Sequence, residues 1–158
     1  MKTLIFFAGL LLALAATRIK DNEFPYPEGY RDWHHVKSGL DNPRNPSMNL
    51  FKGFHHIYAN TKAMDGYRTG KFDNGSIIVF DKLEAVEDEN GSFAEGKRKW
   101  VDVMMKGAGS DSTGGWRFEE FSGDSKTAPV IRHMAVAKCF NCHKQRKDND
   151  FVFSGLRK

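Results

Sequence analysis

Cys139 and Cys142 are the only two cysteines of the chain, and His143 follows the second one directly. The pattern C-x-x-C-H is the attachment pattern of a c-type haem. Two thiols add across the two vinyl groups of one porphyrin, and each becomes a thioether. Residues three and four apart share one face of a helix, so both thiols and the imidazole can face a single macrocycle. The pattern predicts one covalently attached haem per chain, with His143 as the proximal iron ligand.

The C-x-x-C part of this motif also occurs in redox dithiols, in disulfides and in halves of zinc sites. A structural zinc site has four protein ligands, usually as two pairs, and the chain has no second cysteine pair. A thioredoxin-like motif belongs to a βαβ unit, whereas this one follows a strand-rich region near the C-terminus. A plain disulfide or a redox dithiol remains the alternative to haem.

The N-terminus has the features of an export signal. Lys2 is charged, Leu4 to Leu14 is an apolar run, and Ala13-Leu14-Ala15 is a small-x-small cleavage site. We therefore expect residues 1–15 to be a signal peptide and residues 16–158 to form a single haem domain. The apolar run is too short to span a bilayer, although an uncleaved anchor is the alternative. Export together with the haem motif predicts the periplasm, with no membrane association after cleavage.

The charge pattern argues against nucleic-acid binding. The formal net charge is +4, and no dense block of basic residues occurs apart from the scattered Lys144, Arg146 and Lys147. These three side chains follow the haem motif. They could steer an acidic redox partner, or they could simply form a solvated face.

The hydrophobic pattern predicts several strands and few helices. We expect strands over residues 33–37, 54–59, 76–83, 97–106 and 116–121, a short helix from the cap Asn60 to residue 68, and a helix over 135–145 that carries the haem motif. Residues 77–80 are apolar on both faces, which predicts a central strand. The fold class is therefore α+β or mainly β: an antiparallel sheet with a short helix and a C-terminal haem-bearing helix. A four-helix bundle does not fit this pattern.

Four stretches carry a family resemblance: Gly29-Tyr30-Arg31-Asp32-Trp33, Ile57-Tyr58, the run from Gly70 to Val79, and the haem motif with Lys144. In this order, from about Tyr26 to Phe153, the chain resembles the cytochrome P460 family and, within it, the cytochrome c′-beta branch. The resemblance implies a homodimer of mainly antiparallel sheet with one c-type haem per chain and an open distal side. In the P460 branch, a lysine of the central strand is joined to the porphyrin, and the enzymes oxidise hydroxylamine.

The chain departs from the P460 branch at this lysine. Phe80 occupies the matching position, and a phenyl ring cannot form an amine cross-link. Phenylalanines cap the distal face in the c′-beta branch, and the same match makes Phe51 the second cap. Two alternatives stay open. Phe80 could be an ordinary core residue, or a register slip could put Lys82, two residues further on the same face, in the position of the lysine.

Other side chains could take part in a haem site, but the sequence does not choose among them. Neighbouring histidines of a strand point to opposite faces, so at most one of each pair could face the haem. The candidates are His34, His35, His55, His56 and His133; Met48, Met64, Met104, Met105 and Met134 as thioether ligands; and Arg31, Arg117 and Arg132 as partners of the propionates.

These features together favour a periplasmic c-type cytochrome that binds a gas. A five-coordinate haem under an apolar cap would bind small neutral ligands such as NO or CO, for NO sequestration or detoxification. No catalytic residue is assigned. The alternatives are a P460-type oxidoreductase acting on hydroxylamine or a related nitrogen compound, and an electron-transfer cytochrome, which would need a sixth iron ligand.

Overall fold

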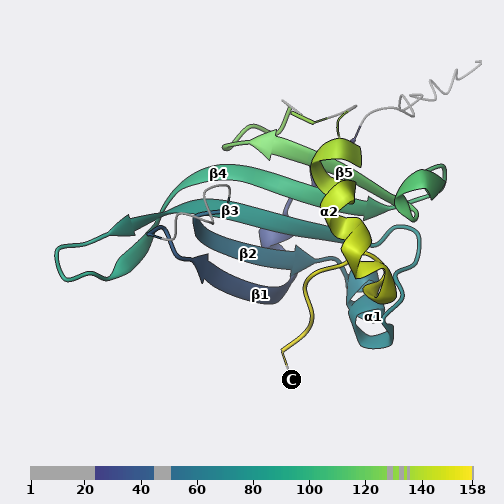
Figure 1. Ribbon diagram of the computed structural model, residues 1–158, viewed down its shortest axis with the longest axis horizontal. Helices are drawn as coiled ribbons and strands as arrows, with labels where there is room; N and C mark the ends of the chain where they lie inside the picture. The colour runs from purple at the N-terminus through teal and green to yellow at the C-terminus, as the bar shows by residue number, and fades with distance from the viewer. Residues whose placement is uncertain (1–23, 45–50, 128–129, 132–133, 135, 158) are drawn as a thin grey trace, which may run out of the picture.

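The computed structural model describes residues 24–44, 51–127, 130–131, 134 and 136–157. Its five strands form one antiparallel sheet, in which each strand pairs with its neighbours in sequence (Figure 1). In chain order they are β1 (His34–Asp41), β2 (Gly53–Ala59), β3 (Ile77–Glu87), β4 (Phe93–Lys106) and β5 (Trp116–Ser122). The predicted mainly β fold is confirmed, and β3 lies in the middle of the sheet as expected.

The helix α1 (Thr61–Thr69) connects β2 to β3. Asn60 caps it, because its side-chain Oδ1 accepts a hydrogen bond from the backbone N–H of Ala63 at 2.9 Å. Gly70 ends it in the left-handed conformation, with φ of 77°. Both ends of this helix were predicted from the cap residues.

Three strand boundaries extend well beyond the prediction. Strand β1 continues to Asp41, which pairs with Gly53, so Asp41 belongs to the sheet and not to the following loop. Strands β3 and β4 extend as a paired hairpin to Glu87 and Phe93, beyond the apolar segments used to predict them. Backbone pairing continues there without a hydrophobic core, and the hairpin protrudes from the rest of the molecule (Figure 1).

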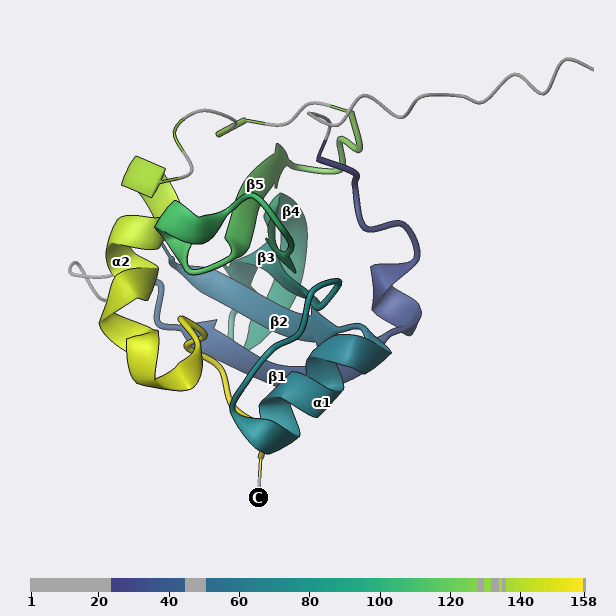
Figure 2. The same ribbon diagram turned by 90° about the vertical axis from the view of Figure 1, so that its right-hand side faces the viewer.

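The sheet buries side chains on both faces. The larger core lies on the face that carries α1 and the C-terminal helical segment (residues 136–149), which we call the helical face. It contains Val36, Ile57, Ala59, Ala63, Met64, Phe72, Ile78, Met104, Trp116, Phe118, Ile131 and Val152. Figure 2 shows α1 and the C-terminal segment on this same side of the curved sheet.

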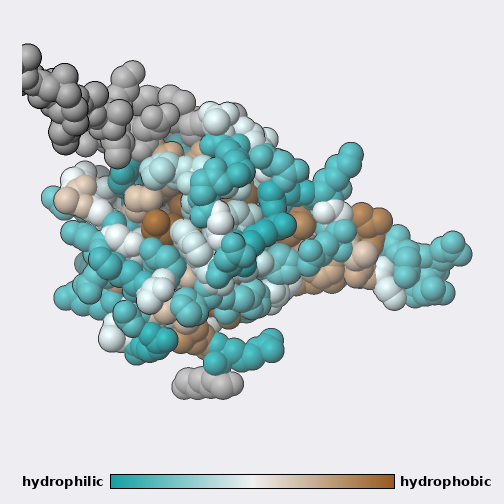
Figure 3. All heavy atoms as spheres, turned by 180° about the vertical axis from the view of Figure 1, so that it is seen from behind, coloured by the Kyte–Doolittle hydropathy of each residue, from teal (hydrophilic) through white to brown (hydrophobic). Residues whose placement is uncertain are grey.

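The smaller core lies on the opposite face. It consists of Tyr30, Val79, Val101, Val103 and Phe121, with side chains of the N-terminal segment packed against it. The short 3₁₀ turn Tyr30–Asp32 brings that segment to the sheet. Seen from this side, the surface is mostly hydrophilic, with separate hydrophobic patches (Figure 3).

The C-terminal helical segment begins with a π-helical turn, Val136–Phe140, continues through α2 (Asn141–His143) and ends in the 3₁₀ turn Lys144–Asn149. The predicted haem-bearing helix is thus present, although it runs further than residue 145. The tail packs back as expected, since Val152 is buried in the larger core. Within the described residues, no helix has the length and apolar character needed to cross a membrane.

Candidate functional site

The haem motif lies on the C-terminal helical segment, where it faces the sheet. Cys139 is partly buried against the larger core, His143 is partly buried and Cys142 is exposed. The two thiols are not joined in a disulfide. The π-helical turn places one more residue in the helical turn that ends at Phe140, and such turns occur frequently at functional sites. A c-type haem requires two free thiols for the porphyrin and one imidazole for the iron, and this helical segment carries all three.

The imidazole of His143 is held in one orientation. Its Nδ1 lies 2.7 Å from the backbone carbonyl oxygen of Phe151, and its ring contacts the rings of Phe118 and Phe153 at centroid distances of 5.1 and 5.0 Å. Burial lowers its pKa, which favours the neutral ring. In a neutral ring that donates from Nδ1, the lone pair lies on Nε2. An imidazole fixed in this way can bind a metal through Nε2.

The carbonyl that holds His143 comes from a strained turn. Asp150 and Phe151 both have positive φ, at 46° and 66°, a conformation that costs about 1–2 kcal/mol for a residue with a side chain. Three bonds hold Asp150 in place. Its Oδ1 accepts from Lys106 Nζ at 2.6 Å, its Oδ2 accepts from the N–H of Phe72 at 2.9 Å, and its carbonyl accepts from Trp116 Nε1 at 2.8 Å. The larger core thereby fixes the orientation of His143.

The surroundings of Cys139 do not suit a redox dithiol. Burial, together with the nearby carboxyl groups of Asp102 and Glu120, raises the pKa of its thiol to about 12. Reactive dithiols have a lowered pKa, because the thiolate is the attacking species. The raised pKa therefore argues against the redox dithiol among the alternatives that the sequence left open.

The two phenylalanines expected over the haem lie together. The rings of Phe51 and Phe80 meet edge to face, with centroids 6.4 Å apart. Phe80 packs against the larger core, as Cys139 does, so both lie on the helical face. Phe80 is only half-buried, whereas its neighbour Val79 is fully buried. Phe51 is 42% exposed. Neither ring has the burial expected of an ordinary core residue.

Polar side chains flank Phe80 on both sides. On one side His55 stacks on the ring, with centroids 5.0 Å apart and planes 19° apart. On the other side Asp102 is the cross-strand partner of Phe80, and Glu120 is the partner of Asp102. Burial, together with the charge of Glu120, raises the pKa of Asp102 to about 8. The two phenyl rings thus lie within polar surroundings, and this region is less apolar than we expected.

Sequence reasoning did not identify Asp102, although a signal was present. Val101 and Val103 alternate with it along β4 and lie in the core of the opposite face. The alternation alone puts Asp102 on the helical face, in a strand with apolar neighbours. A carboxyl group in that position is unusual enough to be singled out.

The structure separates the remaining candidates. His55 faces Phe80, while His56 faces the other way and bonds to Ser38 Oγ and Glu95 Oε1, both at 2.7 Å. Arg31 bonds to Asp81 on the opposite face of the sheet, and the guanidinium of Arg117 lies over the ring of Phe24.

The other candidates differ in burial, and some of them lie outside the described residues. His34 and His35 are exposed, Met64 and Met104 are buried in the larger core, and Met134 is 49% exposed. Met48, Arg132 and His133 lie outside the described residues, as does the expected signal peptide.

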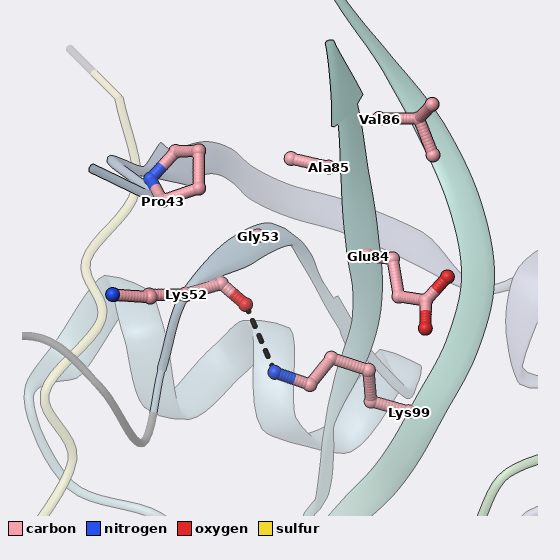
Figure 4. Close-up of a pocket in the computed structure, with 7 residues that line it drawn as sticks. All are labelled: Pro43, Lys52, Gly53, Glu84, Ala85, Val86 and Lys99. Atoms are coloured by element: carbon pink, nitrogen blue, oxygen red, sulfur yellow. Dashed lines mark hydrogen bonds between the residues drawn. The ribbon is translucent and has the colours of Figure 1, made fainter.

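A pocket of about 280 Å³ lies at the base of the β3–β4 hairpin (Figure 4). Lys99 Nζ donates to the carbonyl oxygen of Lys52 at its mouth, at 3.1 Å. The lining residues are Pro43, Lys52, Gly53, Glu84, Ala85, Val86 and Lys99. None of them belongs to the haem motif or to the phenylalanine pair, so this pocket is separate from the candidate site.

The parts of the chain that the structure describes contain no group of three or more His, Cys, Asp or Glu side chains arranged to hold a metal ion. A haem needs one side chain for its iron besides the porphyrin, and the fixed imidazole of His143 fits that requirement.

Comparison with known proteins supports the same assignment. No curated protein sequence matches the chain. The sequence model of the family described as Cytochrome P460 matches residues 27–154. This range includes all five strands, both phenylalanines and the complete haem motif. The chain therefore belongs to the cytochrome P460 family and, as this family implies, is a c-type haem protein.

Proposed function

We propose that the chain is a haem protein of the cytochrome c′-beta kind that binds nitric oxide. In this proposal Cys139 and Cys142 attach one haem through thioethers, His143 Nε2 is the only protein ligand of the iron, and Phe80 and Phe51 cap the opposite side. When bound, the haem iron supplies the position at which the gas binds. CO is expected to bind at the same place.

The observation that carries this proposal is the position of Phe80. By the family resemblance it matches the cross-linked lysine of the P460 branch, and its ring meets that of Phe51 on the helical face. Lys82 Nζ bonds to Asp41 Oδ2 at 2.8 Å and to the Gly53 carbonyl at 3.0 Å, so this amine is already engaged.

Two phenyl rings select ligands through desolvation. A small neutral molecule such as NO loses little hydration when it enters between them. A polar or hydrated ligand must give up hydrogen bonds, at about 1–3 kcal/mol for each group left unpaired. His143, held by the Phe151 carbonyl, keeps its imidazole directed along one axis. These residues thus favour gases over anions.

A P460-type oxidoreductase is the second candidate, and Asp102 is the observation that favours it. Its pKa of about 8 lets it hold or release a proton near neutral pH beside Phe80, as the oxidation of a nitrogen compound would require. The position of Phe80 argues against this candidate because no amine is available there. Simple electron transfer would require a further side chain on the iron.

Three measurements on the purified holoprotein test the proposal. The haem should stay with the polypeptide in acidified organic solvent, and replacing Cys139 and Cys142 by serine should release it. The absorption spectrum should show high-spin, five-coordinate iron. Low-spin, six-coordinate iron alone would contradict the proposal and favour electron transfer. A strongly red-shifted band in the reduced form, together with efficient hydroxylamine oxidation, would favour the enzyme.

The variant Phe80→Ala tests the cap. We expect cyanide to bind more tightly to this variant, because the opened space admits water and polar ligands, while NO affinity changes little. Phe93→Ala is the matched control. Its ring lies on the protruding hairpin, under the guanidinium of Arg44. Equal cyanide affinities in the wild type and Phe80→Ala would mean that Phe80 does not lie over the iron.

We further propose that residues 1–15 are removed on export to the periplasm and that the mature chain forms a homodimer. The N-terminal sequence of the protein recovered from the periplasm tests the first statement, and its mass in solution tests the second. An acidic redox partner would bind at the basic residues Lys144, Arg146 and Lys147, and its affinity would then fall with added salt.

A further inference from the structure

Lys82 is a fully buried lysine on the helical face of β3, two residues from Phe80. A buried ammonium group needs partners, because burial favours its neutral form and lowers its pKa. Lys82 has two, the carboxylate of Asp41 and the carbonyl oxygen of Gly53. Asp41 ends β1 and Gly53 begins β2. Lys82 therefore bonds to both residues that flank the connection between β1 and β2, and Phe51 belongs to this connection.

Gly53 shows how tightly this connection is held against β3. Its φ is +115°, and a Cβ at this position would lie 2.1 Å from the carbonyl oxygen of Leu83. Any other residue would push the start of β2 away from the sheet. The close contact with Leu83 and the hydrogen bond from Lys82 thus both fix the position of Gly53, which is two residues after Phe51.

The network continues from Asp41 to the ring of Phe80. The Oδ2 atom of Asp41 lies 2.8 Å from His55 Nδ1 as well as from Lys82 Nζ. Burial alone would raise the pKa of Asp41, but the hydrogen bonds from Lys82 and His55 lower it overall, so its charge is retained. His55 stacks on Phe80. Its ring also lies so close to Gly39 that a Cβ there would be 2.6 Å from Cε1.

We infer that Lys82, Asp41 and His55 position the rings of Phe80 and Phe51 and thereby set the size of ligand that the distal side admits. This inference rests on the proposed function, since it takes the two rings as the cap over the haem. His55 fixes the plane of Phe80 through stacking, Asp41 fixes the imidazole, and Lys82 fixes Asp41. All three are positioning residues, and Lys82 has this role in place of a bond to the porphyrin.

The test compares ligands of increasing size on the reduced holoprotein. Association of CO, methyl isocyanide and n-butyl isocyanide is measured for the wild type, His55→Ala, His55→Phe and Asp41→Asn. His55→Ala should speed up n-butyl isocyanide association by about tenfold, the factor that one lost aromatic contact can account for. CO should change less than twofold. His55→Phe keeps a ring against Phe80 and should restore rates near those of the wild type. Asp41→Asn should fall between the two.

His56→Ala is the matched control, because it is the next residue of the same strand and its bonds lie on the opposite face. The inference is overturned if His55→Ala changes the isocyanide rates no more than His56→Ala does. If His55→Ala fails to take up haem, Asp41→Asn decides. Equal rates for n-butyl isocyanide in Asp41→Asn and the wild type would then refute it.

A second readout separates this inference from the proposed function. Fluorine NMR of protein labelled with 4-fluorophenylalanine, with the Phe80 signal assigned through Phe80→Leu, reports the position of this ring without any ligand. The Phe80 signal should move in His55→Ala and stay in place in His56→Ala. If the wild type binds neither NO nor CO while the signal moves as expected, the proposed function fails and the positioning role stands. An unmoved signal refutes the positioning role whatever the ligands do.

Discussion

Asp81 and Asp102 lie on neighbouring strands, one position apart in the pairing of β3 with β4, but on opposite faces of the sheet. Asp81 is fully buried and accepts hydrogen bonds from Tyr30 Oη at 2.7 Å, Arg31 Nη2 at 2.8 Å and Arg98 Nε at 2.8 Å. Burial would raise its pKa, but these partners lower it overall. Asp81 is therefore a stable carboxylate.

Asp102 has the opposite surroundings. Trp100 Nε1 donates to its Oδ2 at 2.9 Å, and its other neighbour is the carboxyl group of Glu120, which raises its pKa instead of lowering it. Burial also raises the pKa of Glu120. Burial and this second carboxyl group outweigh the hydrogen bond from Trp100. This pair of carboxyl groups therefore holds a proton at a pH at which Asp81 is charged.

The difference shows how the two faces are used. On the opposite face, the polar groups around Asp81 are satisfied, and they tie the N-terminal segment to the sheet. On the helical face, the carboxyl group of Glu120 adds to the raised pKa of Asp102, and Asp102 lies close enough to Cys139 to raise the pKa of that thiol. Burial is common to both faces, so the partners decide the charge. Groups whose pKa is raised by burial and by a like charge are typical of functional sites.

The largest expected effect comes from removing the charge of Asp81. Asp81→Asn should lower the free energy of unfolding by about 3–5 kcal/mol, because it leaves Arg98 buried without its main counter-charge. Urea unfolding of the holoprotein measures this loss. Asp65→Asn is the control, since Asp65 pairs with Arg68 on the surface of α1 and should cost less than about 1 kcal/mol. Similar losses in both variants would contradict the structural role of Asp81.

Asp102→Asn should have a smaller effect that depends on pH. The pKa of Asp102 is about 8 in the folded chain, against 3.8 for an ordinary aspartate. Between these values the folded state holds a proton that the unfolded state has released. The stability of the wild type should therefore fall as the pH rises from about 4 to 8.

The asparagine variant should lack this contribution, so its advantage over the wild type should grow with pH and reach about 1–3 kcal/mol above pH 8. Unfolding curves at intervals across this range provide the measurement. Parallel pH profiles for the two proteins would show that Asp102 is not protonated in the folded state.

Much of the fold could be predicted from local signals. The alternation of apolar residues located all the strands of the sheet, and the apolar run Ile77–Phe80 identified the central one. Asn60 and Gly70 marked the ends of α1 because caps act through neighbouring backbone groups. The haem motif could be identified because its three donors are adjacent in sequence.

The contacts around the motif could not be predicted, because they join distant parts of the chain. Lys82 and Asp41 are 41 residues apart, and Phe72 and Asp150 are 78 apart. Alternation places Lys82 on the face of Phe80, but only the folded chain shows that its amine is bound. The turn at Asp150 and Phe151, which orients His143, has no glycine to mark its positive φ angles.

The smallest expected effect on the free energy of unfolding concerns the two arginines that bond to Asp81. The side chain of Arg31 is 54% exposed, whereas that of Arg98 is 13% exposed and also pairs with Asp124. Water screens the more exposed ion pair, so Arg31→Ala should cost about 0.2–1 kcal/mol and Arg98→Ala distinctly more. Double-mutant cycles with Asp81→Asn measure the two coupling energies directly. A larger coupling for Arg98 would mean that the more buried ion pair, which joins β3 to β4, is the stronger of the two. If Arg31 couples to Asp81 as strongly as Arg98 does, burial does not set the strength of these pairs, and the contrast with Asp102 would have to come from the number of partners alone.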